Sequence, residues 1–125
     1  MQKLILFILF SCFVNAQKTA NISQKVIKKK GIQLVLKSLI NDSRCPENIN
    51  CIWAGECEIQ VAIYKNRKFI SSDNILLSPK LTKENLEWFQ KYYPNRKIKE
   101  INVLPYPKSE VVVDPKSYFI KILFE

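Results

Sequence analysis

The segment 41–55 constrains the fold of this chain more than any other stretch. It reads NDSRCPENINCIWAG and holds two of the four cysteines, one of the two tryptophans and one of the only two glycines. It lies between two apolar runs with strand-like alternation, so the chain has to turn there. A proline and two asparagines between Cys45 and Cys51 favour a turn. We therefore expect these two cysteines to form a disulfide that closes a short loop.

Two roles stay open for this loop. In the structural interpretation, Trp53 anchors the edge of the core, and Gly55 supplies a positive φ or a close backbone approach. In the functional interpretation, the rigid loop is displayed to a partner. Arg44 has a structural alternative, because its guanidinium can pair with Asp42 or with turn carbonyls. The candidate binding residues are Arg44, Glu47, Asn48, Asn50 and Trp53.

Two motifs resemble the signature of a family of small exported bacterial proteins. The first is DSRCP at 42–46, followed by Cys51 and by WAG at 53–55; the second is PYP at 105–107, before a final apolar strand. The resemblance covers most of the chain and implies export, one disulfide and a mostly β fold. It says nothing about catalysis. The chain departs from the family at Cys57, where a small residue is expected, and at 82–93, which looks like an inserted helix.

Residues 1–16 are typical of a signal peptide. A short basic start is followed by an apolar run over 4–10 and by VNA at 14–16, which fits a cleavage site before Gln17. The apolar run is shorter than the ~20 residues of a membrane span. Two alternatives are an uncleaved anchor and a lipoprotein acylated at Cys12. We expect a single exported domain over 17–125, in the periplasm, at the cell surface or in the medium.

The chain is strongly basic. Its formal net charge is +9, and removal of 1–16, where Lys3 is the one charged residue, leaves +8. Such a surface attracts anionic lipid, polysaccharide or nucleic acid, although dispersed lysines also simply maintain solubility. Nucleic acid is not expected, because no aromatic-and-basic RNA-binding pattern is present and an exported protein, as predicted here, rarely meets nucleic acid. The partners left open are an envelope protein and an anionic surface.

Alternating apolar residues predict several short antiparallel strands. The lead-in 17–30 is either frayed or an edge strand, and a hairpin is expected around Asn66. The helix at 82–93 should begin at a Thr82 cap and pack its aromatic side against the sheet, rather than form a ligand platform. Together these features predict a mainly β fold, either a sandwich or a partly open barrel. The other expected strands are 32–40, 57–63, 98–104, 111–113 and 118–124.

The residues of common catalytic and metal sites are sparse. The chain has no histidine, which removes the usual general base and the commonest metal ligand. Cysteines six positions apart do not match structural zinc sites. We therefore assign no catalytic residue, metal or cofactor. Cys57 lies on the apolar face of its strand, so we expect a buried free thiol; pairing with Cys45, Cys51 or another chain is the alternative.

These observations favour an exported, non-enzymatic binding or envelope-associated module. One alternative is an inhibitor of an exported hydrolase that inserts the loop 42–55 into the cleft of the enzyme. The least favoured hypothesis is a small enzyme that works through carboxylates without histidine. Its candidate groups near the turn are Asp42, Glu47, Glu56 and Glu58.

Overall fold

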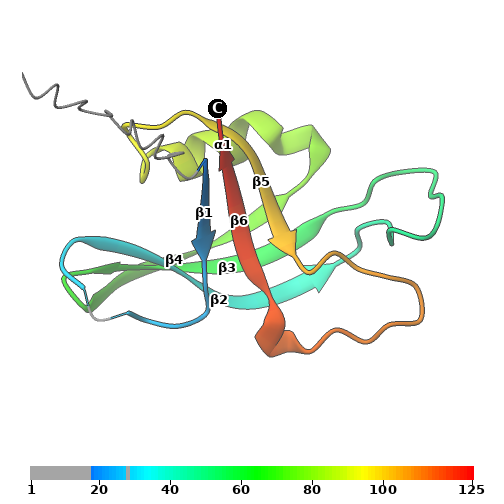
Figure 1. Cartoon of the computed structure of the whole chain (residues 1–125), viewed down its shortest axis with the longest axis horizontal. Coiled ribbons are helices and arrows are strands. Elements are labelled where there is room, and N and C mark those ends of the chain that lie inside the picture. Colours follow the sequence, from blue (N-terminus) through cyan, green and yellow to red (C-terminus); the bar gives the residue numbers. More distant parts are fainter. Residues whose placement is uncertain (1–17, 28) are drawn as a thin grey trace, which may run out of the picture.

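The computed structural model describes residues 18–27 and 29–125; the candidate signal peptide, its cleavage site and Cys12 lie outside this range. Within it, six strands form two antiparallel three-stranded sheets, ordered β1-β6-β5 and β2-β3-β4. The sheets pack as a sandwich with one α-helix and no closed barrel (Figure 1), which confirms the predicted fold class. The strands are β1 (Thr19–Ile22), β2 (Ile32–Asp42), β3 (Cys57–Lys65), β4 (Lys68–Leu77), β5 (Ile98–Leu104) and β6 (Phe119–Phe124).

The core lies between the two sheets and follows the predicted alternation. In β3, every second residue from Cys57 to Ile63 is buried, and in β6 the same holds from Ile120 to Phe124. The expected hairpin is also present, since Asn66 and Arg67 both take positive φ and join β3 directly to β4. Each large apolar side chain buried on β3 and β6 stabilises the folded state by roughly 1.5–3 kcal/mol through its removal from water.

Strand β2 departs from strict alternation. Strict alternation would place Ile32 in the core with Leu34 and Leu36, but Ile32 is exposed, whereas Val35 on the opposite face is buried. The register of β2 with β3 shifts twice, between Leu36 and Ser38 and again between Leu39 and Asn41. Both departures precede these shifts. Ile32 pairs with Lys65 beside the exposed hairpin turn, and Val35 pairs with Ala62, which is also buried, so side chains on both faces of the sheet are buried at that point.

The helix α1 spans Thr82–Gln90, three residues shorter than predicted. A 3-10 turn at Pro79–Leu81 precedes it and is capped by Ser78, whose Oγ accepts from the Lys80 N–H at 3.3 Å. The prediction that Thr82 caps the helix was wrong, because Thr82 is already helical and its hydroxyl donates to the Pro79 carbonyl.

The aromatic side of α1 packs against the sandwich, as predicted. Phe89 is fully buried, and Trp88, Tyr92 and Tyr93 are partly buried against the core. The Trp88 indole N–H donates to Asp73 of β4 at 3.0 Å. These contacts use the aromatic cluster to hold the helix on the sheets.

The expected strand 111–113 does not form. Val111 and Val112 are exposed, and the chain is irregular until a 3-10 turn at Pro115–Ser117. Both neighbours of β6 are already taken by β1 and β5, so the valines have no free edge beside it. Prolines at 107 and 115 also remove backbone donors on both sides of the run.

Cys57 is a buried free thiol at the start of β3, as predicted. Desolvation by burial raises the pKa of the Cys57 thiol to about 11, against the opposing charge of Arg44. At pH 8 this pKa leaves about one thiol in a thousand as the reactive thiolate.

We therefore predict that iodoacetamide at pH 8 leaves Cys57 unmodified in the folded protein. The same reagent should alkylate Cys57 readily in guanidinium, since unfolding restores an ordinary thiol pKa. Peptide mapping by mass spectrometry identifies the labelled residue in both conditions. Rapid native labelling of Cys57 would contradict its placement in the core.

Candidate functional site

The segment after β2 is a disulfide-closed loop, as the sequence predicted. Cys45 and Cys51 are bonded, with their Cα atoms 5.8 Å apart. The loop base continues the β2-β3 hairpin, because Ser43 N–H donates to the Glu56 carbonyl at 2.8 Å. A second rung runs from Cys45 N–H to the Ala54 carbonyl at 3.0 Å. The loop is thus held at its base by backbone hydrogen bonds and closed by the disulfide.

Arg44 points inward and joins several elements. Its Nε and Nη2 donate to the two carboxylate oxygens of Asp42, each at 2.8 Å, and its Nη1 donates to the Val103 carbonyl of β5. The guanidinium carbon also lies 4.6 Å from the centre of the Tyr106 ring. The side chains of Arg44 and Asp42 are only 9% and 10% exposed. Arg44 is therefore a structural residue, not a displayed binding residue.

The ion pair favours the charged forms of both groups. Burial alone would raise the pKa of Asp42, but the hydrogen bonds and charge of Arg44 outweigh it, so the pKa lies below its ordinary value. Burial alone would lower the pKa of Arg44, and Asp42 reverses this effect as well. The pair is fully charged at neutral pH.

Gly55 allows the loop base to close. Its φ is +71°, and a Cβ at this position would lie 2.0 Å from the Ser43 carbonyl oxygen. Gly31 also has a positive φ, +88°, but a Cβ there would meet nothing within 4 Å. A side chain at Gly31 would meet only the strain of a positive φ, whereas a side chain at Gly55 would also clash with the Ser43 carbonyl.

Trp53 is not the core anchor that the sequence suggested. Its side chain is 78% exposed, and that of the preceding Ile52 is 97% exposed. Trp53 lies in the loop that joins β2 to β3, outside the buried core, whose first residue on β3 is Cys57 (Figure 1). Trp53→Ala should therefore not carry the large loss of stability, about 3–5 kcal/mol, that follows truncation of a buried aromatic side chain.

A second loop lies against the disulfide-closed loop. Glu47 N–H donates to the Pro107 carbonyl at 3.0 Å, and Ser109 N–H donates to Asn48 Oδ1 at 2.8 Å. Lys108 Nζ adds an exposed ion pair with Glu47 at 3.9 Å. Glu47 and Asn48, two of the candidate binding residues, thus hold the two loops together.

The two loops lie at one end of the molecule, on the right in Figure 1, and between them carry several exposed apolar side chains. Asn50, the remaining predicted binding residue, is also exposed beside them. Sequence analysis missed the contribution of the second loop, although a valine run between prolines was visible. We call this group the paired-loop surface; it consists of Ile49, Ile52, Trp53, Val111 and Val112.

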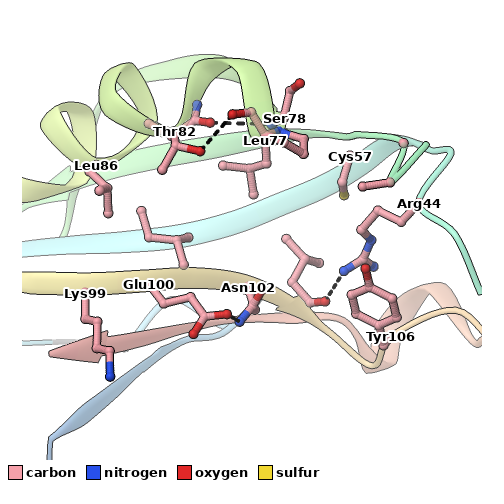
Figure 2. Close-up of a pocket in the computed structure, with 16 residues that line it drawn as sticks. Arg44, Cys57, Leu77, Ser78, Thr82, Leu86, Lys99, Glu100, Asn102 and Tyr106 are labelled. Carbon is pink, nitrogen blue, oxygen red and sulfur yellow. Dashed lines mark hydrogen bonds between the residues drawn. The ribbon is translucent and has the colours of Figure 1, made fainter. Parts of the chain in front are cut away.

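A cleft of about 340 Å³ adjoins the bases of both loops. Figure 2 shows Arg44 and Tyr106 at one end, with the helical side of the cleft facing strand β5. On the β5 side, Asn102 donates to Glu100 at 2.7 Å. On the helical side the cleft is lined by Leu77, Ser78, Thr82 and Leu86.

The cleft has one carboxylate among its lining residues. Glu100 is the lining carboxylate, and it is exposed and hydrogen-bonded to Asn102. Asp42 is held by Arg44 and does not line the cleft. Among residues 18–27 and 29–125, no three cysteine, aspartate or glutamate side chains gather in a way that could hold a metal ion.

Comparison with family models, curated proteins and solved structures finds no match to this chain. The resemblance of DSRCP at 42–46 and PYP at 105–107 to an exported family therefore stays a prediction. No helix among the described residues is long and apolar enough to cross a membrane.

We predict that Asp42→Asn lowers the free energy of unfolding by about 3 kcal/mol at pH 7, because it leaves the buried Arg44 guanidinium without its counter-charge. The pKa of Asp42 is lowered on folding. The contribution of Asp42 to the free energy of unfolding is therefore present above its pKa in the unfolded chain, about 4. It is lost as the pH falls through its lower pKa in the folded protein. Urea unfolding across this pH range should show the gap between parent and variant shrinking below about pH 4.

The control for this measurement is Glu87→Gln, which removes an exposed carboxylate on α1. It should change stability by less than about 0.5 kcal/mol at any pH, as exposed charges do. A parent–variant gap for Asp42→Asn that widens in acid would contradict the ion-pair assignment.

We also predict that Gly55→Ala destabilises the protein more than Gly31→Ala. The alanine at 31 pays only for its positive φ, about 1–2 kcal/mol. The alanine at 55 adds a clash with the Ser43 carbonyl, so its loss should exceed that of Gly31→Ala by about 2 kcal/mol or more. Thermal melts of both variants provide the comparison, and equal losses would refute the close approach at Gly55.

Proposed function

We propose that this protein is an exported, non-enzymatic binding module whose paired-loop surface recognises a protein partner. The observation that supports the proposal best is the exposure of Ile52, Trp53 and Val112 on two loops that are bonded to each other. These side chains are 97%, 78% and 96% exposed. Exposed apolar side chains clustered at one site are typical of interaction surfaces.

The rigidity of the loops supports the same conclusion. The disulfide and the Gly55 contact hold one loop, and the Glu47–Pro107 and Asn48–Ser109 hydrogen bonds attach the other. A surface ordered before binding loses less conformational entropy when the partner arrives. Tryptophan is also among the residues that most often dominate the energy of protein interfaces.

Export is part of this proposal. The predicted signal peptide, the Cys45–Cys51 disulfide and the resemblance to an exported family all support it. The partner would then be a protein of the envelope or the medium.

A second candidate function is inhibition of an exported hydrolase. It is favoured by the shape of the disulfide-closed loop, which extends beyond the sandwich, and by the exposed Ile52 and Trp53 that follow Cys51. An inhibitor of this kind places a rigid loop in the cleft of the enzyme, as standard-sized protease–inhibitor interfaces do.

The test is affinity capture from cell-envelope extract with the parent protein and with the double variant Ile52→Ser/Trp53→Ser. We expect a specific partner to be recovered by the parent and lost by the variant. Each truncation should weaken binding of that partner by about 2 kcal/mol, roughly thirtyfold, when measured by calorimetry. The melting temperature should stay unchanged, since both side chains are exposed.

Ile40→Ser is the matched control, because Ile40 is an exposed isoleucine in β2 that lies outside the paired loops. It should capture the same partner with parental affinity. If a captured hydrolase loses activity with the parent but not with the double variant, the inhibitor hypothesis is favoured. Capture of the same partner by the parent and by the double variant would refute the paired-loop surface as the binding site.

A further inference from the structure

The end of the molecule opposite the paired loops is basic. It is formed by the β3-β4 hairpin and the loop before β2, on the left in Figure 1. No aspartate or glutamate occurs in 18–41 or in 59–72, the sequence ranges that build it. We call this region the basic end; its exposed basic residues are Lys25, Lys29, Lys30, Lys65, Arg67 and Lys68.

Two hydrogen bonds hold the parts of the basic end together. Gly31 N–H donates to Asn66 Oδ1, and Asn66 N–H donates to the Gly31 carbonyl, both at 2.9 Å. The tight turn at Asn66 and Arg67 places Lys65 and Lys68 as cross-strand partners. Lysines from two separate segments are therefore concentrated at one end of the sandwich.

Exposed apolar side chains accompany these charges. Ile27 and Ile32 come from the first segment, and Phe69 and Ile70 from the second; each is about half exposed. Phe69 packs edge-on against Tyr64, and Lys37 Nζ lies 5.0 Å from the centre of its ring. Unlike the paired-loop surface, this end combines apolar residues with a high density of positive charge.

We propose that the basic end docks on an anionic phospholipid bilayer. Lysine and arginine side chains would approach the headgroup phosphates, while Ile70, Phe69 and the nearby isoleucines enter the boundary between headgroups and acyl chains. A soluble polyanion such as a polysaccharide would match the charge but leave the apolar residues unused. The combination of both kinds of side chain therefore favours a bilayer.

The proposal is independent of the protein partner argued above, because the two surfaces lie at opposite ends of the molecule (Figure 1). With the basic end on a bilayer, the paired loops would face away from it. The protein would present its recognition surface to partners next to the membrane.

The test is co-sedimentation with vesicles of phosphatidylcholine, with and without 30% phosphatidylglycerol. Because only the share of anionic lipid, about 30% or none, differs between the vesicles, the comparison measures attraction to the charged headgroups. We expect binding to the anionic vesicles only, and a loss of more than about tenfold when salt is raised to about 0.5 M, as for screened surface charges. All variants are expressed from the same full-length sequence. Any effect of the N-terminal segment on vesicle binding is therefore the same for the parent and for each variant.

Two charge variants locate the docking surface. Lys65→Gln/Arg67→Gln/Lys68→Gln should weaken vesicle binding by about tenfold or more, as should Lys29→Gln/Lys30→Gln/Lys25→Gln on the other segment. Lys80→Gln/Lys83→Gln/Lys121→Gln removes the same charge from exposed positions elsewhere and should retain most of the binding. Equal losses in all three would overturn the proposal, since binding would then follow net charge alone.

Ile70→Ser tests the apolar contribution. It should weaken binding to anionic vesicles several-fold without changing binding to dextran sulfate, a soluble polyanion that has no apolar phase. Circular dichroism melts confirm that each variant is folded before it is compared. If Ile70→Ser binds vesicles as tightly as the parent, the basic end is only a polyanion site and the bilayer proposal is wrong.

Discussion

The buried guanidinium of Arg44 is the interaction on which the rest of this structure depends most. It joins Asp42 at the end of β2 to the Val103 carbonyl of β5, so one side chain connects the two sheets. Its contact with the Tyr106 ring extends the connection to the second loop. Removing one partner of such a pair leaves the other charge buried without a counter-charge, so single substitutions at either position should be strongly destabilising. The positions of both loops and one end of the cleft follow from it.

The surface of the molecule is divided between two kinds of end. The paired loops expose large apolar side chains on a backbone fixed by the disulfide and by hydrogen bonds between the loops. The hairpin end exposes apolar side chains among lysines and lacks acidic residues in the segments that form it. A rigid surface of apolar side chains suits a protein partner, whereas a basic one suits an anionic layer. This difference is the physical basis for assigning the two ends separate roles.

Much of the candidate site could be predicted from the sequence, but not the orientation of its side chains. The disulfide, the close approach at Gly55 and the structural alternative for Arg44 were all confirmed. The role of core anchor given to Trp53 was wrong, because residue type predicts a preference for burial but not whether another segment covers the position. The valines at 111 and 112 were assigned to a strand for a similar reason, since β propensity does not reveal whether an edge is free to pair.

The sequence by itself determined the strands β3, β5 and β6, the hairpin at Asn66, the closed loop and the buried thiol of Cys57. These features depend on alternation and on turn chemistry, which act between residues close together in the chain. Only the tertiary structure decided that Arg44 reaches Val103, that Trp53 lies in solvent and that Asn48 holds a second loop. Each of these outcomes depends on which distant segment contacts a given side chain, and local sequence patterns do not predict such long-range contacts.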